Sequence, residues 1–115
     1  MARSFLTTAA MAAVFLALAA GGTVQAQEPE VYEITIQDHR FTPDELEIPA
    51  GKEAKLVIRN LDPTPEEFES YELNREKIVP AHGEISVYLD PLEPGSYPFF
   101  GEFNQSTAQG KIIVK

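Results

Sequence analysis

Alternating apolar and polar side chains, in short segments separated by turn residues, restrict the fold of this chain more than any other feature. Residues 84–89 show the pattern, with Ile85, Val87 and Leu89 on one side of an extended chain. Proline and glycine clusters end each such segment. The pattern predicts an all-β sandwich or barrel of seven or eight strands. Similar segments cover residues 31–37, 45–48, 54–60, 96–100 and 111–115, while 68–73 and 75–79 are either two further strands or include one irregular excursion.

The first 26 residues have a different composition from the rest. Arg3 precedes an apolar run from about Ala9 to Ala20, and the small residues Val24 and Ala26 complete a cleavage site. The run is short for a helix that crosses a bilayer. We therefore expect a secretory signal peptide over residues 1–26, export to the periplasm, and one domain over residues 27–115.

Negative charge dominates the expected mature chain. It has 18 acidic and 8 basic residues, because Arg3 leaves with the signal peptide. Such a chain repels nucleic acid and anionic membrane surfaces, so we expect neither as a partner, and no membrane insertion after cleavage. It suits a cationic partner, either a metal ion or a basic protein face, although scattered acidic residues also serve solubility alone.

Sulfur ligands are missing from the expected mature chain. The sequence has no cysteine, and its two methionines, Met1 and Met11, lie in the signal peptide. A type-1 copper site needs a thiolate. Thiol redox chemistry and iron–sulfur clusters need one too, so all three are excluded.

Three motifs, taken in order, resemble the cupredoxins. They are FTPDELEIPAGK at residues 41–52, LEPGSYPFFG at 92–101 and GKIIV at 110–114. The resemblance covers residues ~31–115 and implies a Greek-key β-sandwich of cupredoxin type. In the cupredoxin pattern the copper ligands fall on or near Glu67, Gly101, Asn104, and Ala108 or Gln109, so this resemblance implies a domain without a blue-copper site.

A narrower resemblance concerns four short segments. EEFES at residues 66–70, REK at 75–77, FFGEF at 99–103 and TAQG at 107–110 are similar to cupredoxin-like domains of the EfeO/FtrB type. Those domains are periplasmic partners of bacterial iron-uptake permeases. The resemblance implies that this domain binds iron or copper and assists the oxidation of ferrous iron before transport.

Carboxylates stand where the cupredoxin ligands are missing. Glu67 and Glu69 are two residues apart and share one face of a strand, with Glu66 beside them. Glu102 lies on the loop that carries two of the ligands in cupredoxins, and the implied fold brings the two loops together. Four carboxylates in one place would suit iron, manganese or calcium better than copper(I). The alternative is a set of solvated surface glutamates.

Other residues bear on this metal hypothesis. His82, in a loop, is a fifth candidate ligand, although a surface histidine is the commoner case. Arg75 and Lys77 could pair with the glutamates, which would make a salt-bridge network in place of a metal site. Phe100 or Phe103 could form an exposed patch that docks a partner protein.

Two functions of different classes follow. The first is a periplasmic metal-binding accessory protein of a bacterial iron-uptake system, which binds iron or copper through carboxylates and works with permease-system proteins. The second is a metal-free interaction module that docks on a permease or another periplasmic protein. An autonomous ferroxidase ranks last, because the sequence offers no cysteine, tryptophan or histidine pair as a redox route. Any ferroxidase-type assistance would then act through the partner.

Overall fold

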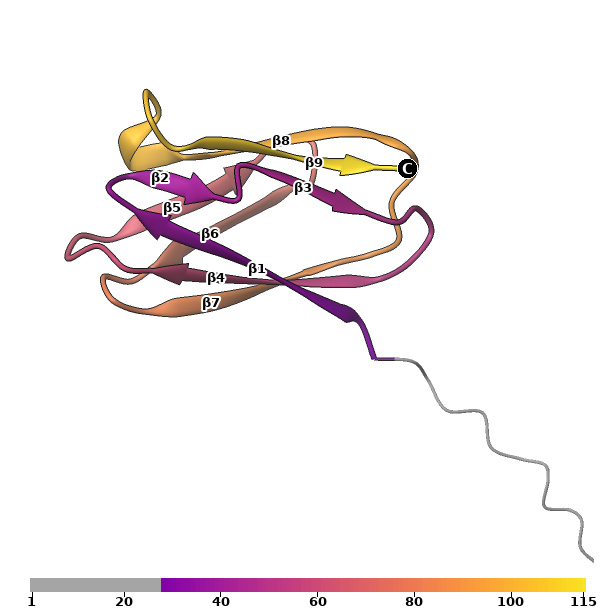
Figure 1. The fold of residues 1–115 in the computed structure, drawn as a ribbon, viewed down its shortest axis with the longest axis horizontal. Helices are drawn as coiled ribbons and strands as arrows, with labels where there is room; N and C mark the ends of the chain where they lie inside the picture. Colours follow the sequence, from indigo (N-terminus) through magenta and orange to yellow (C-terminus); the bar gives the residue numbers. More distant parts are fainter. Residues whose placement is uncertain (1–27) are drawn as a thin grey trace, which may run out of the picture.

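A computed structural model describes residues 28–115 of the chain, so the predicted signal peptide of residues 1–26 lies outside the described part. Two sheets pack face to face in the described part (Figure 1). None of the helices in residues 28–115 has the length and apolar character needed to cross a membrane.

The first sheet has four strands in the order β2-β1-β4-β7. β1 pairs with β4 in parallel, and its other neighbour, β2, is antiparallel. β7 closes the far edge, antiparallel to β4. The strands are β1 (Glu30–Gln37), β2 (Arg40–Thr42), β4 (Ala54–Asn60) and β7 (Glu84–Leu89).

The second sheet has five strands in the order β3-β9-β8-β5-β6. β3 and β9 are parallel, and the other pairs are antiparallel. The strands are β3 (Glu45–Ile48), β9 (Gln109–Val114), β8 (Gly95–Gly101), β5 (Glu66–Ser70) and β6 (Arg75–Val79). A short 3-10 turn, η2 (Glu102–Asn104), follows β8.

The core lies between the inner faces of the two sheets. In β4 every second residue is buried, which places Leu56 and Ile58 inside, as the alternation predicts. The Phe41 ring packs edge-on against Phe99, with ring centroids 4.9 Å apart, and Phe68 lies beside both rings. The prediction of an all-β sandwich is confirmed.

The structure differs from the sequence prediction in two places. The segments 68–73 and 75–79, for which two alternatives were open, belong to a regular hairpin of β5 and β6. Its first strand lies at 66–70, earlier than expected, and its turn ends at Asn74 in the left-handed conformation that asparagine tolerates. The extra strand β2 brings the described residues to nine strands, above the predicted seven or eight. With only three residues, β2 is too short for alternation to reveal it.

Candidate metal-binding site

The buried side chain of Asn60 fixes where β5 begins. Its Nδ2 donates to the carbonyl oxygens of Thr64, at 2.8 Å, and Val79, at 3.3 Å. Its Oδ1 accepts the N–H of Asp62 at 2.9 Å. A buried amide with all these partners stabilises one conformation of the loop over residues 61–65. The loop therefore fixes the register in which β5 pairs with β6 and β8.

Alternation along β5 separates its three glutamates. Glu66 is buried with Phe68, whereas Glu67 and Glu69 lie on the outer face and are half-buried. Glu102, the first residue of η2, approaches the same outer face. One carboxylate oxygen from each of Glu67, Glu69 and Glu102 lies within 4.8 Å of the others. The three residues form what we call the carboxylate cluster, in which β5 and η2 meet. The meeting of these two parts of the chain agrees with the expectation from the sequence.

A fourth carboxylate, which the sequence analysis did not include, stands beside the cluster. Glu76 on β6 is the register partner of Glu69 on β5. Its charge acts on both Glu67 and Glu69. The signal for it was the hairpin itself, because a turn that ends at Asn74 sets Glu76 opposite Glu69.

The four like charges affect one another. Withdrawal from water raises the pKa of Glu67, and the carboxylates of Glu76 and Glu102 raise it further. The pKa of Glu69 is raised by the same withdrawal and then by a hydrogen bond and repulsion from Glu102. The charge of Glu69 also raises the pKa of the nearby Tyr71 hydroxyl. A cation placed among these groups would relieve the repulsion.

Arg75 and Lys77 do not neutralise the cluster. Both alternate with Glu76 along β6, so they project from the opposite side of the strand, toward β7. Arg75 Nε donates to the carbonyl of Tyr88 at 3.1 Å, and Lys77 Nζ donates to that of Ser86 at 3.1 Å. Neither forms an ion pair with a described glutamate of the cluster, and the salt-bridge alternative is wrong for these two residues.

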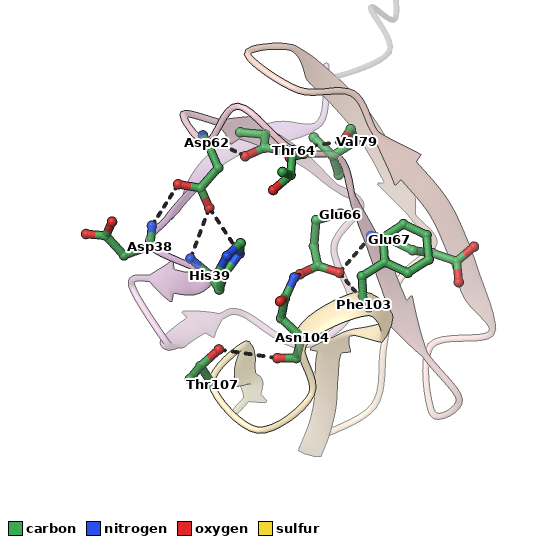
Figure 2. A network of polar contacts seen from close by, with 11 residues as sticks. Asp38, His39, Asp62, Thr64, Glu66, Glu67, Val79, Phe103, Asn104 and Thr107 are labelled. Atoms are coloured by element: carbon green, nitrogen blue, oxygen red, sulfur yellow. Dashed lines mark hydrogen bonds and ion pairs between the residues drawn. The ribbon is translucent and has the colours of Figure 1, made fainter.

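Glu66 lies on the inner side of β5 and does not join the cluster. Its side chain is buried, and the residue is 1% exposed. Figure 2 shows the Glu66 carboxylate between Phe103 and Asn104, while Glu67 extends to the other side of the strand. Three donors bind the Glu66 carboxylate: the N–H of Glu67 at 3.0 Å, the N–H of Phe103 at 2.8 Å and Asn104 Nδ2 at 2.8 Å.

His82 also lies apart from the cluster, next to Asp62. Its N–H donates to the Asp62 carbonyl at 3.0 Å. The Asp62 carboxylate accepts hydrogen bonds from the backbone N–H groups of Asp38, at 2.8 Å, and His39, at 3.0 Å (Figure 2). The His39 ring atom Nδ1 lies 3.6 Å from Asp62 Oδ2. Burial alone would raise the pKa of Asp62, but these N–H groups and the two imidazoles lower it by more. The two histidines therefore flank a carboxylate that anchors a turn.

The residues at the cupredoxin copper position do not fit a type-1 copper ion. Gly101, where the pattern places the thiolate, has no side chain. A Cβ built there would lie 2.6 Å from Glu66 Cδ and 2.7 Å from Ala108 Cβ. Asn104, where the pattern places an imidazole, donates to the same Glu66 carboxylate. Carboxylate, amide and methyl groups thus fill the space, and none is the soft ligand that this copper centre requires.

Exposed aromatic side chains border the cluster. Phe99 belongs to the core, but Phe103 is 52% exposed and Tyr71 is 72% exposed. The Tyr71 ring packs against Phe100, with centroids 5.5 Å apart. The outer face of β5 and β8 therefore combines uncompensated negative charge with apolar surface.

Solved structures of two copper proteins share this fold. The metal-binding domain of the Cu(I)-exporting P-type ATPase CopA of Streptococcus pneumoniae D39, with Cu(I), superposes with a TM-score of 0.66 and 16% identity, over 78% of this chain and 91% of that one. Auracyanin A, a "blue" copper protein of Chloroflexus aurantiacus, superposes with a TM-score of 0.66 and 15% identity, over 76% and 100%. At these identities the likeness concerns the fold.

Sequence comparison gives a nearer relative and a family. An uncharacterized protein of Rickettsia prowazekii (strain Madrid E) is 54% identical over 82 residues, which are 71% of this chain and 66% of that protein. The chain therefore spans just under two thirds of the length of this relative. The family model for the cupredoxin-like domain matches residues 8–114. This match, over most of the chain and together with the two-sheet sandwich, shows that the chain belongs to the family of cupredoxin-like domains.

Proposed function

We propose that this domain binds a hard metal cation, with iron as the foremost candidate, through Glu67, Glu69 and Glu102. One observation carries the proposal: three carboxylate oxygens from two separate segments lie within 4.8 Å of one another. Repulsion among them, with Glu76 added, is not relieved by any ion pair among the described residues. A bound cation would convert this unfavourable arrangement into a favourable one.

The spacing suits ions with oxygen ligands. Calcium–oxygen bonds are about 2.3–2.6 Å long, so ligands on opposite sides of one ion are up to about 5 Å apart. The three oxygens lie no more than 4.8 Å from one another, which is within that reach, and small side-chain rotations would bring them around iron or manganese. Carboxylates select hard cations over copper(I), so copper would bind as copper(II) if it binds.

The proposed biological setting is a periplasmic iron-uptake system. It rests on the similarity of segments 66–70, 75–77, 99–103 and 107–110 to the EfeO/FtrB type of cupredoxin-like domain. The cluster is half-exposed, so a bound ion would keep coordination positions open to water or to a partner. We propose an accessory role, in which the domain presents iron to permease-system proteins and any change of oxidation state depends on the partner.

Metal titration of the purified protein tests the proposal. Mn²⁺, anaerobic Fe²⁺ and Tb³⁺ should each bind as one ion per chain, with nearby Tyr71 sensitising the Tb³⁺ luminescence. Glu67→Gln, Glu69→Gln and Glu102→Gln should each weaken binding by on the order of tenfold or more, because each removes a charged ligand. Glu84→Gln, a matched control at a glutamate that pairs with Arg59 on the other sheet, should leave affinity unchanged. Equal affinity in all four variants, or no binding at micromolar metal, would contradict the proposal.

The exposed aromatic residues support a second candidate function, a metal-free docking module. Tyr71 and Phe103 extend apolar surface beside the negative charge, which suits a protein face with both basic and apolar groups. A double variant, Tyr71→Ser with Phe103→Ser, separates the two functions. If the domain is a docking module, the variant loses binding to a purified permease-system component in the presence of a chelator, while its affinity for Mn²⁺ is unchanged. Equal binding by variant and wild type would count against docking at this face.

A further inference from the structure

We propose that Glu66 is a positioning residue, whose buried carboxylate holds η2 against β5 and thereby sets the spacing of the carboxylate cluster. The inference rests on the proposed metal-binding function. It assigns to Glu66 the role of a cross-link inside the sandwich, while the neighbouring glutamates face outward as ligands.

One oxygen atom joins the two segments that carry the cluster. Glu66 Oε1 accepts the N–H of Glu67 at 3.0 Å and the N–H of Phe103 at 2.8 Å. The first donor belongs to a member of the cluster, and the second belongs to the residue next to Glu102. Charge-assisted hydrogen bonds of this kind are stronger than neutral ones. The distance between the backbones of Glu67 and Glu102 is therefore fixed through a single acceptor.

The second oxygen of Glu66 extends the cross-link to the following turn. Oε2 accepts Asn104 Nδ2 at 2.8 Å. The Asn104 carbonyl in turn accepts the N–H of Ala108 at 2.8 Å, and the Ala108 carbonyl accepts the N–H of Gly101 at 2.9 Å. This chain of bonds closes residues 101–108 into one loop that is tied to β5 through Glu66.

Burial makes the position of Glu66 well determined. A carboxylate away from water is costly unless it is hydrogen-bonded. The Glu66 side chain therefore stays in the position where it accepts hydrogen bonds from its three donors. Gly101 provides the room, because a Cβ there would lie 2.7 Å from Glu66 Oε2. Both oxygens are engaged and point inward, which leaves neither available to an ion bound on the outer face.

Three variants with stated roles test the proposal. Glu66→Ala removes the cross-link. Glu66→Gln keeps one oxygen for the two N–H donors, and its amide nitrogen can donate to Asn104 after a flip of the Asn104 amide. Ser70→Ala is the stability control: it is on the same face of β5 and loses bonds to Pro98 and Leu73, away from η2.

The first measurement uses metal-free protein and amide hydrogen exchange by NMR. In Glu66→Ala the Phe103 amide should lose its protection, and the NOE contacts between η2 and β5 should weaken. Glu66→Gln and Ser70→Ala should retain both. Unchanged protection and contacts in Glu66→Ala would overturn the proposal, whether or not the wild-type protein binds metal.

The second measurement is the affinity for Mn²⁺ and Tb³⁺. Residues that orient metal ligands typically contribute 10–100-fold to affinity, so Glu66→Ala should weaken binding by at least about tenfold. Glu66→Gln should recover most of the affinity, and Ser70→Ala should bind as the wild type does despite a lower Tm. Wild-type affinity in a folded Glu66→Ala variant would overturn the positioning role, whereas absence of binding in the wild type would overturn only the proposed metal function.

A further variant covers the case in which Glu66→Ala does not fold. Asn104→Ala leaves Glu66 in place and removes the bond at Oε2. It should lower the affinity and the protection of the Phe103 amide in the same direction but by less. If neither quantity changes in a folded Asn104→Ala protein, the cross-link does not set the cluster and the proposal fails.

Discussion

Glu66 and Glu67 are adjacent and chemically identical, yet their side chains have different environments and different proposed roles. The first is buried and accepts three hydrogen bonds, and the second faces outward among like charges. Strand alternation alone causes the difference. A buried carboxylate is tolerated because its donors are in place, whereas the half-exposed cluster is tolerated because remaining contact with water and salt partly screens its charges.

Substitution of Gly101 should be poorly tolerated. In Gly101→Ala the new methyl group would lie 2.6 Å from Glu66 Cδ and 2.7 Å from Ala108 Cβ, so Glu66 must move off its donors. We expect a loss of about 1–3 kcal/mol in the free energy of unfolding, the usual range for overpacking. Urea denaturation measures it. The pair Gly101→Ala with Ala108→Gly should recover part of the loss, and full wild-type stability in Gly101→Ala alone would show that Glu66 is not held as described.

Asp62 predicts a dependence of stability on acid pH. Its pKa in the folded protein lies below the ordinary 3.8, so the folded state favours the charged form. The stabilisation is fully present above pH 3.8 and is lost as the pH falls through the lowered value. Wild type should therefore be more stable than Asp62→Asn at pH 5–7, with the difference shrinking below about pH 3.8. A difference that stays constant from pH 6 to pH 2.5, measured by urea denaturation, would contradict this.

At the scale of elements, the β5–β6 hairpin organises the acidic face. Register pairing puts Glu69 opposite Glu76, and the turn after β8 brings Glu102 to the same place. Like charges opposite one another destabilise a sheet. The hairpin therefore retains an arrangement that is unfavourable in the absence of a cation.

Removal of one of these charges should stabilise the metal-free protein. The pKa of Glu69 is raised above the ordinary 4.5, so its ionisation costs stability: the cost begins as the pH rises through 4.5 and is complete above the folded pKa. Glu69→Gln should have a higher Tm than wild type at pH 7 in the presence of a chelator. The advantage should vanish below about pH 4.5, where both states are protonated. A lower Tm for Glu69→Gln at pH 7 would show that Glu69 has a stabilising partner.

Much of this element-scale picture follows from sequence, and the rest does not for identifiable reasons. Alternation in 54–60 and 84–89 located β4 and β7, and the spacing of Glu67 and Glu69 placed them on one face. The expectation that Glu66 joins Glu67 and Glu69 is wrong. Alternation along the strand places Glu66 on the same side as the apolar Phe68, so the sequence pattern itself indicates that Glu66 points inward. The hydrogen bonds that join Glu66 to η2 depend on contacts 37 and 38 residues apart, which local patterns do not encode.

At the scale of the whole molecule, negative charge is in excess, and the ion pairs of the described residues lie away from the carboxylate cluster. The net charge is −9. Arg59 pairs with Glu33 and Glu84 on the first sheet, and Lys111 and Lys115 pair with glutamates of β3. The acidic face over β5 and η2 is thereby left as a place where a cation would be attracted.

Ligand binding should therefore raise global stability. A cation that binds the folded state alone adds about 2.7 kcal/mol when its concentration is 100 times Kd. We expect Mn²⁺ to raise the Tm of wild type in a concentration-dependent manner and to leave the Tm of the triple variant of Glu67, Glu69 and Glu102 to Gln unchanged. Calorimetry in matched ionic strength separates this effect from general screening by salt. An equal rise in both proteins would assign it to screening.

The packing around Gly101 also opposes the introduction of a copper ligand at this position. A cysteine introduced there would place its Cβ against the Glu66 carboxyl group, to which Asn104 donates a hydrogen bond. A thiolate-ligated copper centre at this position would require that the Glu66 side chain leave the interior, and that change would remove the tie between β5 and η2 before any ion could replace it. Single substitutions in either order therefore pass through a less stable protein.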